Sequence, residues 1–342
     1  MKKFASVLLA AALTLSLAAC GAKTNEGAQS TPESTPNTTN TTDTTKIPVI
    51  GINQYGEHPS LDNCREGFIQ GLESAGLTEG VDFTIDYQNA GFDDNINTQI
   101  GQNFSANNVS LMCGIATPSA MSCYAAAENK DIPVVYVAVT DPEAAGLTAG
   151  GITGVSDKLA VDGQLALIRA MQPEATTIGI IYTLSEPNSV SAIAEYEEKA
   201  ADYGFTIAAY GVTAQSEVTL AATALISQGV DCFSNLTDNN VVGVLASILE
   251  KTNEAGIPVY GSEIEQVKIG CVASIGIDYV VLGAQAGVMA AAIIKGEKTA
   301  DDISYETISQ YSMYINSEAL EELGMSVDDE IISIYDAIDT SK

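Results

Sequence analysis

The residues best suited to bind a small molecule stand directly after the expected β-strands. Sixteen such residues occur, mostly in loops that open a helix: Gln54, Tyr55, His58, Thr117, Pro118, Ser119, Thr140, Asp141, Glu186, Asn188, Ser189, Thr237, Asp238, Asn239, Glu263 and Asp278. Any one of these polar loops is first of all a candidate helix cap. Because ligands of open α/β sheets bind beyond the carboxyl ends of the strands, their recurrence after strand upon strand predicts a shared polar cleft.

The charges in these loops favour a ligand that carries both an ammonium and a carboxylate. The chain has only two arginines, Arg65 and Arg169, and both lie inside expected helices, so no guanidinium clamp is expected. A ligand carboxylate would instead meet helix N-termini and the side chains of Thr117, Ser119, Asn188 and Ser189. A ligand ammonium would pair with Asp141, Glu186, Asp238, Glu263 or Asp278. A zwitterionic amino acid fits this set better than a sugar or a phosphate ester.

The same residues favour binding without chemical change. The single histidine, His58, stands in a loop, and the chain has no GxSxG and no Walker motif, so His58 is expected to contact the ligand or the loop instead of acting as a base. With Tyr55 and Tyr279 it would form a flat wall for an aromatic side chain; a place in the hydrophobic core is the alternative for each tyrosine. One histidine does not support a His-rich zinc site, and neither a metal nor a cofactor is expected.

Composition sets the scale of the protein and excludes one class of partner. The 342 residues suffice for two ordinary domains, and 46% hydrophobic residues predict packed cores. The formal net charge is −30, from 14 Lys plus Arg against 44 Asp plus Glu. Nucleic acid is therefore not expected as a partner, because so negative a surface repels phosphates.

The elements that must position the cleft follow an alternating pattern from residue 47 onward, typical of parallel sheets covered by helices. The first series predicts strands at 47–52, 82–87, 109–113, 133–139 and 151–155, with helices at 60–75, 95–106 and 118–129. The second predicts helices at 157–171, 189–203, 216–228 and 239–255, with strands at 177–182, 205–211, 230–234, 257–260 and 269–275. The fold class is therefore α/β, with two doubly wound parallel-sheet lobes side by side.

The N-terminus predicts export and a lipid anchor. A basic start precedes the apolar stretch 4–19, and Leu17-Ala18-Ala19-Cys20 resembles the lipobox of bacterial lipoproteins, which implies that residues 1–19 are a removed signal peptide and that Cys20 is lipidated. An ordinary secretory signal with an incidental Cys20 is the alternative. Residues 20–46, rich in Thr, Pro and Asn, are expected to be a disordered tether. The five remaining cysteines are expected to be free and buried, with a Cys113–Cys123 disulfide as the alternative.

Eight ordered motifs resemble the ABC-transporter substrate-binding proteins of the tryptophan/tyrosine-binding type. The resemblance covers about residues 47–325. The motifs are Glu57-His58-Pro59-Ser60-Leu61-Asp62, Arg65-Glu66-Gly67-Phe68, Ile85-Asp86-Tyr87-Gln88-Asn89-Ala90, Ala116-Thr117-Pro118, Val139-Thr140-Asp141-Pro142, Asn188-Ser189, Thr237-Asp238-Asn239 and Gly276-Ile277-Asp278-Tyr279. The cysteines and the residues Tyr55 and Pro187 depart from that pattern.

The resemblance implies a type I periplasmic-binding fold, with two lobes joined by three crossovers near 156, 277 and 301. It divides the chain into an N-terminal lobe of 47–156 plus 278–300, with helix 279–295, and a C-terminal lobe of 157–277 plus 301–342, with strand 310–315 and helix 317–323. It also implies hinge closure on a small ligand outside the membrane and delivery to a permease with a separate ATPase subunit. A purine or nucleoside, a sugar, another organic acid, or an extracellular α/β enzyme are the alternatives.

Overall fold

The structure is a computed structural model that describes residues 47–328, 331–333 and 336–341. Cys20, the expected signal peptide and the expected tether lie outside the described residues. Within the described ranges, no helix combines the length and the apolar character that crossing a membrane requires.

The first lobe is built on a six-stranded sheet in which every neighbouring pair is parallel. Its order is β11-β5-β4-β3-β1-β2, from strands β1 (Val49–Gln54), β2 (Thr84–Asn89), β3 (Leu111–Ile115), β4 (Val134–Val137), β5 (Ile152–Ser156) and β11 (Glu306–Thr307). Strands β3 and β4 are buried along their whole length, as expected for parallel strands covered on both faces. This arrangement places the carboxyl ends of the strands at one edge of the lobe.

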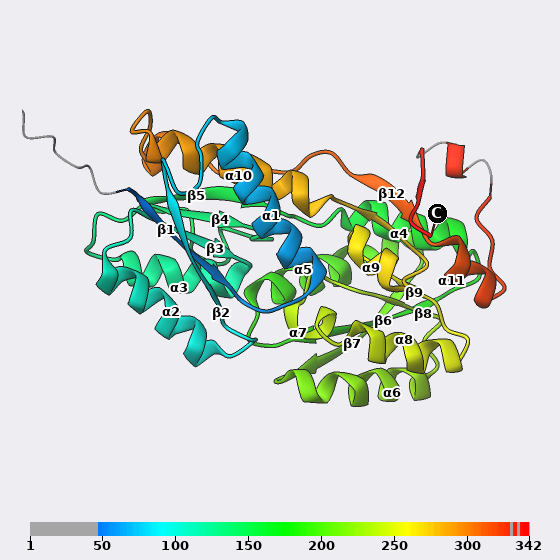
Figure 1. Ribbon diagram of the computed structural model, residues 1–342. Coiled ribbons are helices and arrows are strands. Elements are labelled where there is room, and N and C mark those ends of the chain that lie inside the picture. Colours follow the sequence, from blue (N-terminus) through cyan, green and yellow to red (C-terminus); the bar gives the residue numbers. More distant parts are fainter. Residues whose placement is uncertain (1–46, 329–330, 334–335, 342) are drawn as a thin grey trace, which may run out of the picture. The chain divides into compact units, whose positions relative to one another are not determined.

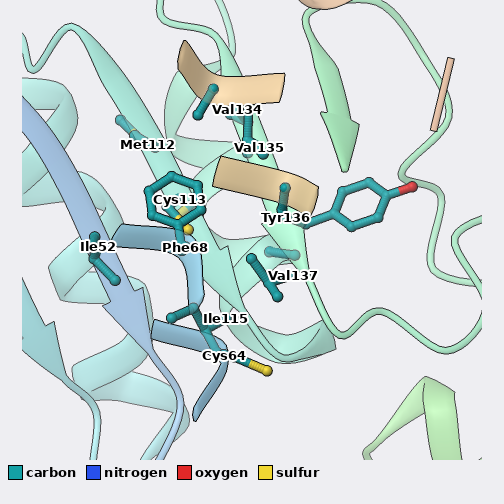
Figure 2. Close-up of a cluster of buried hydrophobic side chains, with 14 of the residues drawn as sticks. Ile52, Cys64, Phe68, Met112, Cys113, Ile115, Val134, Val135, Tyr136 and Val137 are labelled. Atoms are coloured by element: carbon teal, nitrogen blue, oxygen red, sulfur yellow. The ribbon is translucent and has the colours of Figure 1, made fainter. Parts of the chain in front are cut away.

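Helices cover both faces of this sheet. Figure 1 shows α1 (Pro59–Ser74) and α10 (Tyr279–Ile294) on one side, and α2 (Asp94–Asn107) and α3 (Thr117–Ala127) on the other. The core between them joins side chains of α1 to the central strands, and Figure 2 shows Cys64 and Phe68 beside residues of β3 and β4. Each of these helices begins close to a strand end, so the sheet edge and the helix N-termini are brought to the same place.

Helices α1 and α10 approach each other closely through four glycines. A Cβ atom added at Gly67, Gly71, Gly283 or Gly287 would lie 2.1–2.2 Å from a backbone oxygen of the other helix. Only residues without a side chain allow this separation, because a backbone oxygen cannot rotate away. The N-terminal ends of both helices are thereby fixed relative to each other.

The second lobe contains a parallel four-stranded sheet and a three-stranded sheet. The first has the order β7-β6-β8-β9, from β6 (Thr177–Thr183), β7 (Thr206–Val212), β8 (Cys232–Ser234) and β9 (Val259–Tyr260). The second has the order β10-β12-β13, from β10 (Ala273–Gly276), β12 (Ser312–Ile315) and β13 (Ile338–Asp339). Backbone hydrogen bonds from Val272 to Val259 and from Gly261 to Ala273 connect the two sheets. Strand β12 runs antiparallel to β10, so this lobe is parallel only in part.

Two apolar cores lie on the faces of this second sheet system. One includes side chains of α4 (Val161–Met171) and α5 (Pro187–Lys199), and it extends to α11 (Ser317–Glu322). The other includes side chains of α6 (Val218–Gln228), α7 (Asn239–Val242) and α8 (Leu245–Glu254). Short 3₁₀ helices follow α5, precede α6 and precede β11, at Ala200–Tyr203, Gln215–Glu217 and Ala300–Asp302. The α/β fold class with two sheet-based lobes is confirmed.

Three local expectations are corrected. The helix expected at 239–255 is two helices, because the chain breaks at Gly243–Val244. A six-residue helix, α9 (Ile264–Ile269), precedes β10 where a continuous strand was expected from residue 269. The third crossover follows residue 307 instead of 301, because β11 pairs with β5 of the first lobe; its two residues are exposed and carry no apolar run.

The five described cysteines are all buried and free. Cys113 and Cys123 do not form a disulfide, and burial raises the pKa of both thiols. Their role is packing, as expected from the sequence.

Candidate functional site

A pocket of about 20 Å³ lies where the strand ends of the two lobes converge. This volume holds about one water molecule, far less than a small-molecule site, so a ligand requires the walls of the two lobes to move apart. Its wall consists of His58, Ser60, Leu61, Ala116, Ala138, Asp157, Asn188, Thr237, Asn239, Val242, Glu263, Gln266 and Tyr279. Most of these residues follow the carboxyl end of a strand within a few positions, which is where open α/β sheets bind ligands.

The structure brings together some of the predicted residues and separates others. His58, Asn188, Thr237, Asn239 and Glu263 lie in the wall. Eleven predicted residues do not: Gln54, Tyr55, Thr117, Pro118, Ser119, Thr140, Asp141, Glu186, Ser189, Asp238 and Asp278. Most of these lie just behind the wall and support it.

Glu186 and Asp238 are supports, because surrounding donors occupy both carboxylates. Glu186 is buried and accepts hydrogen bonds from the side-chain amides of Asn188, Asn239 and Asn240 and from the backbone N–H of the last two. Asp238 accepts from Thr183, Ser189 and the N–H of Val241. Burial raises the pKa of both groups, and for Glu186 the nearby Asp238 adds to the shift. Neither carboxylate is available to a ligand ammonium.

Two other carboxylates were also expected to pair with an ammonium and lie elsewhere. Asp278 caps α10 by accepting from the N–H of Val280 at 2.8 Å, and it faces a different groove. Asp141 accepts from Ser191 at 2.5 Å and from the N–H of Ala144. The capping interpretation therefore accounts for Asp278, and a contact between the lobes accounts for Asp141.

The remaining supports on the first lobe have local hydrogen-bond partners. Gln54 accepts from Arg65 at 2.8 Å, and Tyr55 donates to Asp94 at 2.8 Å. Ser119 donates to Asn97, and Pro118 occupies the first turn of α3. Tyr55 is thus not part of an aromatic wall; the rings that line the pocket are those of His58 and Tyr279.

Two carboxylates do line the pocket, Asp157 and Glu263. Glu263 caps α9 by accepting from the N–H of Glu265 and Gln266, and burial raises its pKa to about 7. Asp157 accepts from Thr140 at 2.9 Å and from Tyr279 at 2.6 Å, and burial raises its pKa as well. Sequence reasoning missed Asp157, because the helix expected from residue 157 begins at Val161; the residue follows a buried strand directly.

Several buried polar atoms around the pocket have no partner in the described part of the chain. They are Oδ1 of Asn188, Oγ1 of Thr117 and one ring nitrogen of His58, because the ring has the side chain of Asn239 as a hydrogen-bond partner. Burial lowers the pKa of His58 to about 4, although nearby Asn239 and Asp62 oppose the shift, so the ring is neutral near pH 7. Buried polar groups are rarely left unpaired in proteins, and a polar ligand would satisfy those that line the pocket.

Two alanines in the wall have backbone angles that normally favour glycine. Ala116 follows β3 with φ 76° and ψ 155°, and Ala138 follows β4 with φ 59°. Such conformations cost about 1–3 kcal/mol each and concentrate at functional sites. Sequence reasoning could not find them, because alanine carries no signal for a positive φ.

Four side-chain hydrogen bonds cross between the lobes beside the pocket. Ser60 donates to Glu263 at 3.1 Å, and Asn63 donates to Glu265 at 2.9 Å. On the other side, Thr140 and Thr237 lie 3.1 Å apart through their hydroxyls, and Ser191 donates to Asp141. The pocket is therefore enclosed by contacts that exist only while the lobes are together.

Comparison with known proteins places this site in a family. A family model described as ABC transporter substrate binding protein matches residues 49–337. The chain belongs to this family. Over 330 residues it is 35% identical to a tyrosine-binding protein of Clostridioides difficile (strain R20291), covering 95% of this chain and 93% of the relative.

Two solved structures are similar to this chain to different degrees. An ABC domain in complex with L-Trp from Streptococcus pneumonia has a TM-score of 0.81 at 30% identity, covering 85% of this chain and 99% of that one. The ligand-free, open structure of a substrate binding protein with adhesive properties from Clostridium difficile has a TM-score of 0.63 at 34% identity, covering 83% and 97%. This substrate-binding protein therefore resembles the ligand-bound structure more closely, although the open one is nearer in sequence.

Proposed function

We propose that this ABC transporter substrate-binding protein captures an amino acid with an aromatic side chain and delivers it unchanged to a membrane permease. The observation that carries the proposal is the composition of the pocket wall. It combines the buried carboxylates of Asp157 and Glu263 with unpartnered polar atoms of His58 and Asn188. Leu61, Val242 and the ring of Tyr279 supply the apolar part that an aromatic side chain requires.

The comparisons support this class of ligand. The curated relative at 35% identity is a tyrosine-binding protein, and one similar structure holds L-Trp. Capture would proceed by hinge closure. Contacts made by both lobes at once, such as Ser60 to Glu263, form only in the closed state, so a ligand that binds both lobes shifts the population toward closure.

The first prediction is a ligand-dependent thermal shift. At 100 times its Kd, L-tyrosine or L-tryptophan should stabilise the protein by about 2.7 kcal/mol, which corresponds to a rise in Tm of about 4 °C for a protein of this size. The panel also contains aliphatic amino acids, sugars, nucleosides and organic acids, and calorimetry measures affinity for each ligand that gives a shift. A shift with a nucleoside or a sugar and none with any amino acid would overturn the proposal. Release of a product from the bound ligand would revive the enzyme alternative.

We also propose that Cys20 anchors the protein to the outer face of the cell membrane. The support is the Leu17-Ala18-Ala19-Cys20 sequence, together with membership in a family that serves membrane transporters. The substitution Cys20→Ala should move the protein from the membrane fraction to the soluble fraction. Cys123→Ala removes a buried thiol and should leave the protein on the membrane. If Cys20→Ala stays with the membrane, the anchor lies elsewhere.

A further inference from the structure

We propose that Asp157 receives the ammonium group of the ligand and couples its capture to closure of the lobes. This assignment rests on the proposed function, because it assumes a ligand with an amino group. It adds a residue that the sequence did not single out and a mechanism by which charge recognition closes the hinge.

Asp157 lies where the lobes are joined. It directly follows β5, at the first crossover, and its carboxylate accepts a hydrogen bond from the Tyr279 hydroxyl at 2.6 Å. Tyr279 is the first residue of α10, just past the second crossover. One carboxylate thus connects two of the chain segments about which the lobes would rotate, and it also forms part of the pocket wall.

The buried Asp157 carboxylate has no cationic partner among the described residues. The ion pairs of the described chain involve other acids, and Lys158, the next residue, reaches Glu195 instead at 3.8 Å. Two hydroxyl donors and its own backbone N–H occupy three of the roughly four acceptor sites of this carboxylate. An ammonium in the pocket would supply the missing charge and the missing hydrogen bond.

The other pocket carboxylate is less available. Glu263 already accepts two backbone N–H bonds at the start of α9 and a third hydrogen bond from Ser60. The two backbone N–H donors make Glu263 the cap of α9, and the hydrogen bond from Ser60 connects it to the first lobe. Asp157 also accepts three hydrogen bonds, but two of them come from side-chain hydroxyls, which can rotate to make room for a cation, whereas two of the donors to Glu263 are fixed backbone N–H groups of α9.

Two hydroxyl groups connect Asp157 to the second lobe by hydrogen bonds across the cleft. Thr140 of the first lobe donates to Asp157 at 2.9 Å, and its oxygen lies 3.1 Å from the hydroxyl of Thr237 in the second lobe. With Thr140 Oγ1 as donor to Asp157, Thr237 is the donor to Thr140. A ligand ammonium fixed on Asp157 would lie beside this bridge, and its binding would favour the state in which the bridge is made.

The test compares L-tyrosine with 3-(4-hydroxyphenyl)propionate, which lacks only the amino group. Calorimetry on the wild-type protein should show affinity for L-tyrosine about 100-fold higher, as expected for a desolvated charge-assisted pair. In Asp157→Asn this ratio should fall to about 3-fold or less, through loss of affinity for L-tyrosine alone. Asp202→Asn makes the same change at an exposed position outside the pocket and should keep the wild-type ratio.

Two further measurements, of lobe closure and of the position of the ligand, also use the wild-type protein and so do not rely on the variant alone. Small-angle X-ray scattering should show that L-tyrosine compacts the wild-type protein and that it does not compact Asp157→Asn. A crystal structure of the wild-type complex should place the ligand nitrogen within hydrogen-bond distance of Asp157, which holds even if the variant fails to fold. Tight L-tyrosine binding with an unchanged ratio in Asp157→Asn, or a ligand nitrogen on Glu263, overturns the assignment and leaves the proposed function standing. Wild-type protein that binds no amino acid overturns both.

Discussion

Glu186→Ala is expected to destabilise the protein by about 3–5 kcal/mol and to abolish ligand binding. Glu186 does not line the pocket, yet its carboxylate accepts hydrogen bonds from five amide donors. Two of the side chains that it holds in this way, Asn188 and Asn239, line the pocket. Alanine would leave those donors buried without an acceptor, which costs about 1–3 kcal/mol for each donor that water does not reach. It would also leave Asn188 and Asn239 without a fixed orientation.

The measurement is denaturant unfolding together with calorimetric titration of L-tyrosine or L-tryptophan. A loss of this size corresponds to a fall in Tm of roughly 5–8 °C. Glu186→Gln keeps the shape of the side chain and one acceptor oxygen, so its stability and affinity should lie between those of the wild type and of Glu186→Ala. Glu198→Ala changes an exposed residue of α5 and should change stability by less than about 0.5 kcal/mol. Wild-type affinity in Glu186→Ala would show that the orientation of these amides does not matter for binding.

The strands that could be predicted from the sequence are the fully buried ones, because a strand that is buried on both faces consists of a continuous run of apolar residues. Strands β3 and β4 are buried throughout, and their runs at 109–113 and 133–139 mark them within about two residues. Strand β11 escaped, because two exposed residues at a sheet edge carry no such pattern. The break between α7 and α8 was not predicted, because the apolar period continues through Gly243. The hydrogen bonds that fix the start of α7 come from Glu186, which is distant in sequence, and from Asp238, which precedes the helix.

For the site, the sequence could locate the loops but not the direction of each side chain. Glu186, the N-cap of α5, and Asn188, in the first turn of α5, are two residues apart, yet the first points to the start of α7 and the second to the pocket. That difference depends on how α7 packs, which no local pattern encodes. Composition likewise showed that acids exceed cations, but only burial and hydrogen bonding separate the saturated carboxylates of Glu186 and Asp238 from that of Asp157.

Gly287→Val is expected to destabilise the protein by about 3 kcal/mol and to weaken ligand binding at the same time. The valine Cβ would start 2.1 Å from the backbone oxygen of Phe68 and 2.9 Å from Cα of Gly71, so α1 and α10 would have to separate. These helices carry Ser60 and Tyr279 at their first turns, and both residues line the pocket. A shift of the helix pair would therefore move two parts of the wall.

Even alanine, the smallest substitution at Gly287, is expected to lower stability, because the cost of crowding exceeds the gain in helix propensity. Gly287→Ala gains up to about 1 kcal/mol of helix propensity, but crowding in a well-packed core costs about 1–3 kcal/mol, and here the obstacle is backbone that cannot change rotamer. We therefore expect Gly287→Ala to be destabilising, by less than Gly287→Val. Val288→Ile adds volume at the next, exposed residue of α10 and should be nearly neutral. Thermal unfolding and L-tyrosine titration of the three variants test this, and a Gly287→Ala protein more stable than wild type would show that the helices can separate at little cost.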